Sequence, residues 1–187
     1  RWFDYWLKNR PGLDHETPVK IFVMGRNRWR FEKEYPLAET QYRKLYLHSD
    51  GHANSSRGNG RLEWDTPLPD SPPDRYLYDP KNPVPSLGGN TCCGTPTATG
   101  PVDQRPIEQR QDVLVYTSDF LEEELEVTGS LQLVLYAATN VPDTDFVAKL
   151  VDVYPDGKAI NVAEGILRAR YRHGPDSPQL LQKHRIY

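Results

Sequence analysis

The most regular alternation of apolar and polar residues lies in the second half of the chain. Three leucines at alternate positions of 131–136 share one face of a strand pattern. The next segment, 146–154, is an apolar run interrupted only by Lys149 and Asp152, and the Pro-Asp-Gly-Lys sequence after it predicts a tight hairpin turn. The chain then returns through apolar segments within 159–171. This pattern predicts antiparallel β architecture at the centre of a β-sandwich.

Shorter strand patterns precede this region. The clearest of them alternates Val19, Ile21 and Val23 on one face and stops at Gly25. The segments with such patterns are residues 18–25, 28–32, 42–48, 61–64 and 112–117. Because strand patterns follow one another along most of the chain, the sequence predicts an all-β fold.

A single helical pattern opens the chain. Four apolar side chains fall close to one helical face, namely Trp2, Phe3, Trp6 and Leu7. The Asn-Arg-Pro-Gly sequence at 9–12 is typical of a helix end. Such a helix either packs on the sandwich or is the last helix of a preceding domain. We expect the second arrangement, with residues 1–12 forming that helix and its linker and residues 13–187 forming the β domain.

The longest stretch without periodicity is residues 67–106, which hold ten prolines. Segments of this length inside a compact domain are usually functional or disordered. Tyr76, Tyr78 and Leu87 supply apolar anchors within it. We therefore expect an ordered loop.

The composition limits the number of domains and the classes of partner. A chain of 187 residues is one ordinary domain or one domain with an attached fragment. Its net charge of -3, with basic residues dispersed among acidic ones, provides no field that would attract nucleic acid or an anionic membrane. No apolar run reaches the roughly 18 residues of a membrane span, and no signal-peptide pattern opens the sequence. We expect neither nucleic acid nor a membrane as a partner, and we expect a cytoplasmic location.

The sequence lacks the motifs of the common catalytic and cofactor sites. It has no G-x-S-x-G nucleophile elbow, no phosphate-binding loop, no dinucleotide-binding glycine pattern and no H-E-x-x-H zinc motif. His48 and His52 are the only histidine pair at a spacing that suits a metal, but they bracket a glycine-containing turn. Solvated loop histidines are the better interpretation. We expect no metal and no cofactor.

Cys92 and Cys93 are the only cysteines, and they are adjacent. Adjacent cysteines cannot join distant strands, so they form no disulfide framework. Two reduced, partly buried thiols are the simpler interpretation, and a strained vicinal disulfide is the alternative. A nucleophilic cysteine needs a nearby base, which the neighbouring sequence does not supply.

Several short segments stand along nearly the whole chain in an order that is specific, although each segment is modest by itself. They are RWFDYWLK at 1–8, VKIFVMG at 19–25, YLYDP at 76–80, PVPSLGG at 83–89, GPVDQRP at 100–106 and DTDFVAKLVDVYPDG at 143–157. In this order they resemble the CocE/NonD serine hydrolases, a family of cocaine-esterase-like acyl esterases, α-amino-acid ester hydrolases and X-Pro dipeptidyl-peptidases. The part of the family that this chain resembles is the C-terminal jelly-roll domain.

The resemblance implies a jelly-roll β-sandwich of the galactose-binding-like type, preceded by the last helix of an α/β-hydrolase domain. In the family, that upstream domain carries the Ser-His-Asp triad and an inserted helical cap. The resemblance thus implies that this chain holds no catalytic residue and supports a hydrolase that acts on ester or amide substrates. Family members continue with further strands, so we expect a domain truncated before its last strands. Because an incomplete sandwich exposes apolar faces, we expect it to associate with the hydrolase domain or with another copy.

The resemblance also implies one substrate-facing loop. In cocaine-esterase-like members, the residues after the glycine pair that corresponds to Gly88 and Gly89 are apolar or aromatic and reach toward the acyl pocket. The matching positions here are Cys92 and Cys93, whose smaller side chains would leave a roomier or differently shaped pocket. Gly89, Cys92 and Cys93 are therefore the expected substrate-binding residues, within an expected lining of residues 88–94.

A stand-alone carbohydrate-binding module is the alternative, because jelly rolls also build sugar sites from exposed aromatic rings. Six rings are candidates for such a platform: Trp29, Trp64, Tyr42, Tyr46, Tyr76 and Tyr78. Coplanar exposed rings would favour the sugar module, whereas rings buried under the proline-rich loop would favour a scaffold. Fold alone does not decide between them.

Overall fold

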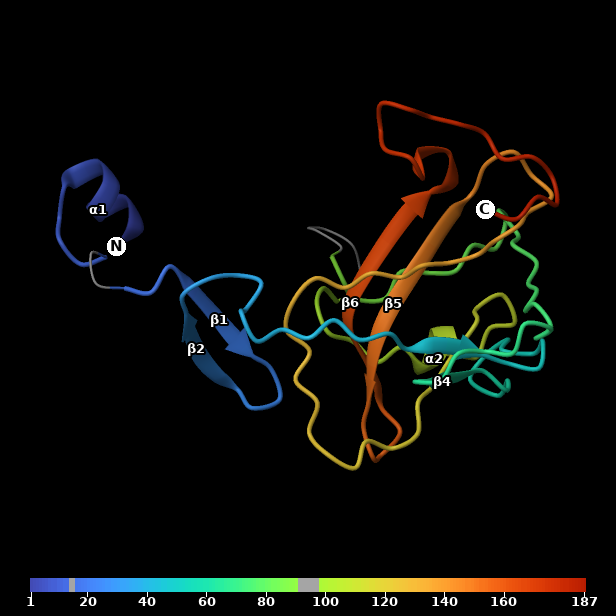
Figure 1. The fold of residues 1–187 in the computed structure, drawn as a ribbon, viewed down its shortest axis with the longest axis horizontal. Coiled ribbons are helices and arrows are strands. Elements are labelled where there is room, and N and C mark those ends of the chain that lie inside the picture. The colour runs from blue at the N-terminus through green and yellow to red at the C-terminus, as the bar shows by residue number, and fades with distance from the viewer. Residues whose placement is uncertain (14–15, 91–97) are drawn as a thin grey trace. The chain divides into compact units, whose positions relative to one another are not determined.

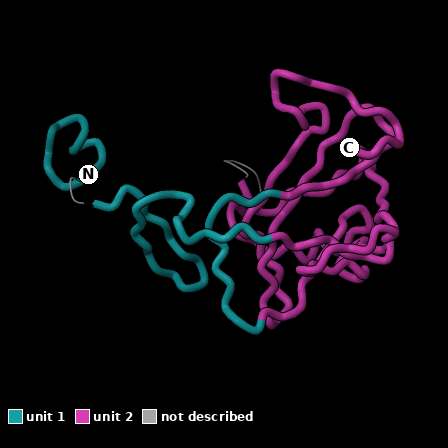
Figure 2. Tube along the Cα trace, in the orientation of Figure 1, with its two compact units in different colours: residues 1–43, 122–132 teal, residues 44–121, 133–187 magenta. Residues whose placement is uncertain are grey.

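The residues that the computed structural model describes are 1–13, 16–90 and 98–187 (Figure 1). They form two compact units (Figure 2): unit 1, of residues 1–43 and 122–132, and unit 2, of residues 44–121 and 133–187. The boundary after residue 12 that the sequence suggests stays a prediction.

Unit 1 contains a short helix and one β-hairpin, both close to their predicted positions. Helix α1 (Trp2–Lys8) ends at Asn9, whose φ of 50° is left-handed. Strands β1 (Val19–Val23) and β2 (Arg28–Glu32) pair antiparallel along their whole length. Gly25, in the turn between them, has a φ of 82°, a conformation that glycine adopts without a steric cost.

Unit 2 contains two further hairpins. Strand β3 (Tyr46–His48) pairs with β4 (Arg61–Glu63), and β5 (Asp145–Val153) pairs with β6 (Ala159–Arg168) (Figure 1). The predicted turn joins β5 to β6, and the register of this pair shifts at a bulge between Leu150 and Val151.

Two short helical segments complete the regular elements that the structure describes: α2 (Arg105–Glu108) and the 3₁₀ turn η1 (Ala169–Tyr171). No helix within the described ranges is long and apolar enough to cross a membrane.

Two segments that were predicted as strands join no regular ladder. Residues 131–136 form no strand in the described part of the chain, although Ala137, which follows them, exchanges two hydrogen bonds of 3.0 Å with Tyr187. Residues 112–117 make only isolated bridges, such as that between Leu114 and Asn54. Alternation along a sequence identifies the faces of a strand but not a partner backbone, so the prediction of regular strands was wrong for both segments.

The described strands form three separate antiparallel pairs, β1–β2, β3–β4 and β5–β6. The predicted all-β class is confirmed. The closed double sheet of a jelly roll is only loosely supported, because these sheets are small and open.

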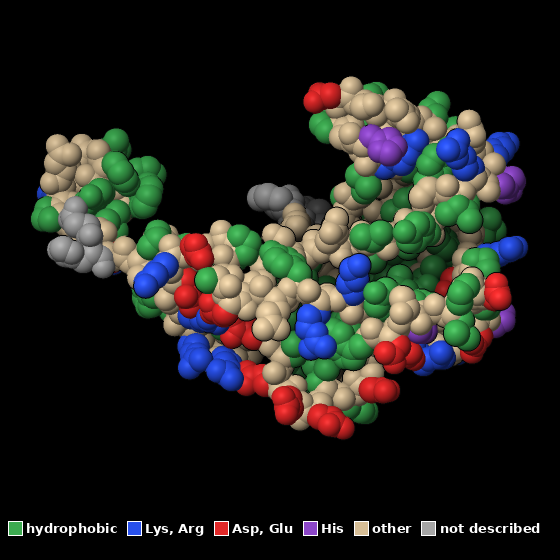
Figure 3. Space-filling model, in the orientation of Figure 1, with side chains coloured by type: hydrophobic (Ala, Val, Ile, Leu, Met, Phe, Trp, Pro, Cys, Tyr) green, Lys and Arg blue, Asp and Glu red, His purple; other side chains and the backbone are tan. Residues whose placement is uncertain are grey.

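The apolar core is small. Its buried apolar side chains, among the residues described, are Leu37, Ala53, Ile107, Ala159, Ala169 and Leu181. Val147 and Ile166, which face each other across β5 and β6, are 62% and 68% exposed. Apolar side chains gather on the face of unit 2 that Figure 3 shows, a surface of the kind that another domain covers.

Candidate functional site

The predicted substrate-facing loop starts at a glycine pair in unit 2, and the structure describes the base of this loop. Gly88 and Gly89 have left-handed φ values of 64° and 73°. Gly89 donates a 2.7 Å backbone hydrogen bond to Gly100 and accepts one of 3.0 Å from it. This bridge closes the loop. Cys92 and Cys93 lie outside the described residues, so their predicted role stays a prediction.

Gly88 has no room for a side chain, and a side chain on Gly89 would displace the carboxylate of Glu164. A Cβ atom on Gly88 would lie 2.4 Å from the carbonyl oxygen of Gly100 and 2.8 Å from Cγ2 of Val102. A Cβ atom on Gly89 would lie 2.2 Å from Oε1 of Glu164. Gly88 therefore lets the loop backbone lie against residues 100–102, and Gly89 lets it lie against Glu164 of β6.

Two charged side chains of the β5–β6 hairpin hold the loop backbone. Lys149 and Glu164 stand opposite each other in register, with 3.9 Å between Lys149 Nζ and Glu164 Oε2. Glu164 Oε1 accepts a 2.6 Å hydrogen bond from the N–H of Asn90. Lys149 Nζ donates a 3.3 Å hydrogen bond to the carbonyl of Leu87. The two side chains thus hold the backbone on both sides of the glycine pair.

Two buried amides complete this network. Gln104 and Asn161 are only 2% and 3% exposed. Gln104 Oε1 accepts a 2.8 Å hydrogen bond from Lys149 Nζ, and its Nε2 donates bonds of 3.0 Å to the carbonyls of Leu87 and Val102. Asn161 Oδ1 accepts a 2.7 Å bond from the N–H of Val102. An ammonium donor on one side and carbonyl acceptors on the other determine how the Gln104 amide is oriented.

We use the name loop clamp for four side chains: Lys149, Glu164, Gln104 and Asn161. Sequence reasoning missed this network, although Lys149 was visible as an interruption of an apolar strand. Counted from the turn without a bulge, the register would place Lys149 opposite Ala163. The bulge shifts the pairing so that Lys149 faces Glu164 instead. No local signal in the sequence shows this shift.

A second polar cluster attaches the proline-rich loop to the rest of unit 2. Asp74 accepts hydrogen bonds of 2.6 Å from both Ser49 Oγ and Tyr116 OH, and one of 2.7 Å from the N–H of Ala53. Burial raises the pKa of Asp74, but the three hydrogen bonds and the nearby His52 outweigh it, so the pKa lies below its ordinary value. The loop is therefore ordered at this point, as predicted.

The same cluster contains the residue types of a catalytic triad, but its geometry is structural. The Ser49 hydroxyl donates to the carboxylate of Asp74, whereas the nucleophilic serine of a Ser-His-Asp triad donates to the histidine. Burial first, and then its bond to the Asp74 carboxylate, raise the pKa of Tyr116, so this phenol stays protonated. No serine hydroxyl in the described part of the chain is hydrogen-bonded to a histidine.

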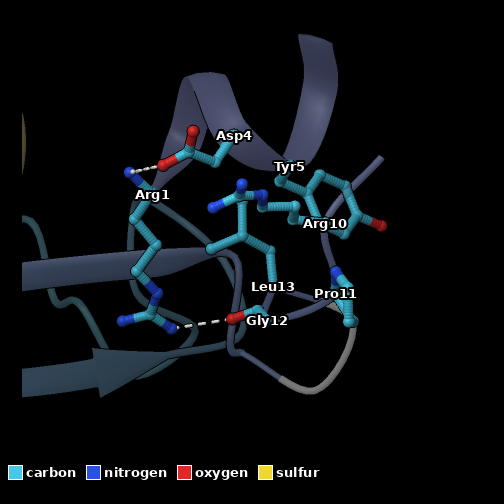
Figure 4. Close-up of a pocket in the computed structure, with 7 residues that line it drawn as sticks. All are labelled: Arg1, Asp4, Tyr5, Arg10, Pro11, Gly12 and Leu13. Atoms are coloured by element: carbon cyan, nitrogen blue, oxygen red, sulfur yellow. Dashed lines mark hydrogen bonds and ion pairs between the residues drawn. The ribbon is translucent and has the colours of Figure 1, made fainter. Parts of the chain in front are cut away.

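A cavity of about 260 Å³ lies beside α1 in unit 1 (Figure 4). Its walls are formed by Arg1, Asp4, Tyr5, Arg10, Pro11, Gly12 and Leu13. The amino group of Arg1 lies 3.3 Å from Asp4 Oδ2, and its guanidinium donates a 2.7 Å bond to the carbonyl of Gly12. The charged groups of Arg1 are thus bound by other groups of the wall. The volume of the cavity is below that of most small-molecule sites. We assign no ligand to it.

A second cavity, of about 240 Å³, lies in unit 2 between α2 and the β5–β6 turn. Burial, and to a smaller extent the charge of Asp103, raise the pKa of Glu108 in its wall. Arg105, also in the wall, is bound by Asp103, with 2.8 Å between Nε and Oδ2. No hydroxyl among the described residues of this wall is hydrogen-bonded to the Glu108 carboxyl, so we assign it no catalytic role.

The described residues contain no cluster of three side chains that could hold a metal. His48, which was considered as a ligand, is engaged within unit 2. Its Nε2 lies 2.7 Å from the carbonyl oxygen of Asp65, and its Nδ1 lies 3.6 Å from Glu63 Oε2.

Five of the six candidate sugar-binding rings are exposed, and the sixth is half-buried. Trp29 and Tyr42 in unit 1 are 57% and 66% exposed, and Trp64 and Tyr78 in unit 2 are 46% and 53% exposed. Lys20 Nζ lies 4.5 Å from the centroid of the Trp29 ring and so covers one of its faces. A surface that another domain covers has the same exposure, so exposure alone does not distinguish the two functions.

Comparisons with known proteins agree over nearly the whole chain. Residues 11–187 match the family described as X-Pro dipeptidyl-peptidase C-terminal non-catalytic domain. Cocaine esterase of Rhodococcus sp. (strain MB1 Bresler) is 47% identical over 186 residues, which are 99% of this chain and 32% of that protein. A putative serine esterase of Mycobacterium bovis is 31% identical over 191 residues, covering 95% of this chain and 27% of that protein.

Two solved structures resemble the whole chain. An aminopeptidase from a marine sediment Thaumarchaeota archaeon matches with a TM-score of 0.78 and 28% identity, over 100% of this chain and 31% of that one. An α-amino acid ester hydrolase matches with a TM-score of 0.79 and 27% identity, over 100% and 32%. The chain thus spans about a third of the length of the proteins that it matches.

Proposed function

Because the chain belongs to the family of X-Pro dipeptidyl-peptidase C-terminal non-catalytic domains, we propose that it acts within a longer serine hydrolase that cleaves esters. The domain itself is non-catalytic. Its task is to support the catalytic domain and to line part of the substrate pocket. The observation that carries this proposal is the apolar surface that unit 2 exposes. The alignment of the chain with 32% of the length of an esterase supports it.

The proposed partner of that surface is an upstream α/β-hydrolase domain with its cap. Many large apolar side chains of unit 2 are exposed, which is expected for a domain that folds against another. Exposed apolar pairs such as Val147 and Ile166 on the β5–β6 hairpin supply the kind of contact that such a domain covers. Association with a second copy of the chain is the competing way to cover it, and the molar mass of the full-length protein in solution distinguishes the two.

Ester hydrolysis is favoured over dipeptide release, because the relatives of higher identity are esterases. The reaction would be acyl transfer, in which an upstream serine attacks the carbonyl, a histidine moves the proton and preorganised donors hold the oxyanion. The full-length protein should therefore hydrolyse p-nitrophenyl esters faster than an X-Pro p-nitroanilide.

The central experiment compares two forms of the protein. p-Nitrophenyl acetate turnover is measured on the 187-residue chain and on the product of the longest open reading frame that contains it. We expect activity in the longer form only. Hydrolysis by the 187-residue chain alone would contradict the proposal and would make Cys92 and Cys93 the first candidates for a nucleophile.

We propose that residues 88–94 line the acyl pocket, with Gly89, Cys92 and Cys93 facing the substrate. In the full-length enzyme, Cys93→Phe should narrow the pocket and lower kcat/KM for bulky acyl groups about tenfold more than for acetyl. Ser177→Phe places the same ring on an exposed turn and is the matched control. The same acyl preference in both variants would exclude this lining role.

Two further expectations have their own tests. Binding of the 187-residue chain to polysaccharides, with no esterase activity in the longer protein, would favour the carbohydrate module instead. The cytoplasmic location stays a prediction that cell fractionation checks.

A further inference from the structure

We propose that the loop clamp sets the acyl specificity of the hydrolase by holding the backbone of residues 88–90 in place. This inference rests on the proposed function, in which that loop faces the substrate. Lys149, Glu164, Gln104 and Asn161 are positioning residues in this role, because they hold the loop and do not contact the substrate.

The two charged members of the clamp contact the loop through its backbone. Lys149 Nζ donates to the carbonyl of Leu87, and Glu164 Oε1 accepts the N–H of Asn90. Backbone contacts determine the path of a chain whatever its side chains are. The clamp therefore holds the base of the loop without using the side chains that would contact a substrate.

The charged pair of the clamp directs its hydrogen bonds away from itself. Lys149 and Glu164 are 3.9 Å apart, beyond hydrogen-bond distance, and their hydrogen bonds go to the loop and to Gln104. At the end of the same hairpin that is remote from the turn, Arg168 and Asp145 also face each other in register. Arg168 donates two bonds of 2.9 and 3.0 Å directly to Asp145. One pair holds a loop, whereas the other connects only its own two strands.

The carboxylate of Glu164 also lies close against the backbone of Gly89. The carboxylate of Glu164 occupies the space that a side chain of Gly89 would need. The side chains of Lys149 and Glu164 are only 20% and 24% exposed, so water replaces their contacts poorly. A change at Glu164 is therefore transmitted to the loop backbone, and displacements of about 1 Å in a substrate-positioning segment are enough to change turnover.

The experiment uses the full-length enzyme and two substrates, p-nitrophenyl acetate and p-nitrophenyl benzoate. Lys149→Met keeps the apolar stem and removes the ammonium, and Glu164→Met does the same for the carboxylate. We expect each variant to change the benzoate-to-acetate ratio of kcat/KM about tenfold. Glu164→Gln keeps an oxygen that accepts the Asn90 N–H, so it should restore most of the wild-type ratio. Arg168→Met is the matched control and should leave the ratio unchanged.

The ratio distinguishes positioning from stability, because partial unfolding lowers turnover of both esters equally. Hydrogen exchange at the amide of Asn90 gives a readout that does not depend on activity, and it should speed up in Glu164→Met but not in Arg168→Met. If the full-length wild type is active and both Lys149→Met and Glu164→Met keep its benzoate-to-acetate ratio, this inference alone is overturned. A full-length wild type that hydrolyses no ester would overturn the proposed function itself.

Discussion

The β1–β2 hairpin of unit 1 and the β5–β6 hairpin of unit 2 use the same antiparallel pairing, but their charged side chains act differently. Beside β1–β2, charges pair with one another at the surface, as in the contact between Arg26 Nη2 and Glu124 Oε2, whose side chains are 45% and 59% exposed. On β5–β6, Lys149 and Glu164 bind the backbone of a separate loop and a buried amide. The difference shows that the partner and the burial of a charge, and not its presence on a strand, determine its contribution.

The largest expected effect is at the glycine pair. Gly88→Ala should destabilise unit 2 by about 3 kcal/mol, because the new Cβ meets the carbonyl oxygen of Gly100 and the branched side chain of Val102, and a left-handed φ disfavours alanine. Gly25→Ala in the β1–β2 turn has a similar φ but meets nothing within 4 Å, so it should cost about 1 kcal/mol. Thermal unfolding of the full-length protein measures both. Equal costs would mean that the loop base is not tightly packed.

The next effect is at the buried amide of the clamp. Gln104→Leu leaves the ammonium of Lys149 without one acceptor and the carbonyls of Leu87 and Val102 without one donor. We expect a loss of about 2 kcal/mol in the free energy of unfolding. Gln109→Leu, the same change at an exposed position of unit 2, should have little effect. Urea denaturation compares the two variants, and similar midpoints would contradict the importance of this network.

A third effect depends on pH and concerns Asp74. Its pKa is lower in the folded protein than in the unfolded chain, so its stabilisation is complete above an ordinary pKa of about 3.9 and is lost as the pH falls through the lowered value. Asp74→Asn should cost about 1 to 2 kcal/mol at pH 7, where the carboxylate accepts three bonds. The difference in melting temperature between wild type and variant should shrink below pH 4. A constant difference would show that the charge of Asp74 is not responsible.

The smallest effect is expected at the surface of unit 1. Arg26 and Glu124 form a close ion pair, but their side chains are 45% and 59% exposed. Water and salt screen such pairs, so Glu124→Gln should cause no measurable change in melting temperature at physiological salt. A shift comparable to that of Asp74→Asn would remove the contrast between exposed and buried charges.

Local patterns predicted much of this fold. The helix near residues 2–8, the β1–β2 hairpin and the strands on both sides of the turn at 155–158 lie close to their predicted positions. Residues 131–136 have an equally clear alternation, yet they join no ladder among the residues described. Pairing depends on a second backbone at the correct distance, and alternation along one segment carries no information about it.

At the candidate site too, local sequence indicated one part and distant pairing produced the other. The family resemblance pointed to Gly89 through the glycine pair, but it did not connect that pair with Lys149 or Glu164. These residues are 60 and 75 positions away from Gly89 along the chain, and the pairing of β5 with β6 brings them together beside residues 87–90.

The sequence by itself determined the all-β class, the opening helix and the tight turn between β5 and β6, because each depends on residues within a few positions of one another. Only the tertiary structure decided the loop clamp. The bulge after Leu150 moves Lys149 from Ala163 to Glu164, and it thereby places an ammonium and a carboxylate on either side of a glycine pair. Hydrogen bonds between distant segments form only where the folded backbone brings donor and acceptor within about 3 Å of each other, and that distance is not encoded in any local pattern.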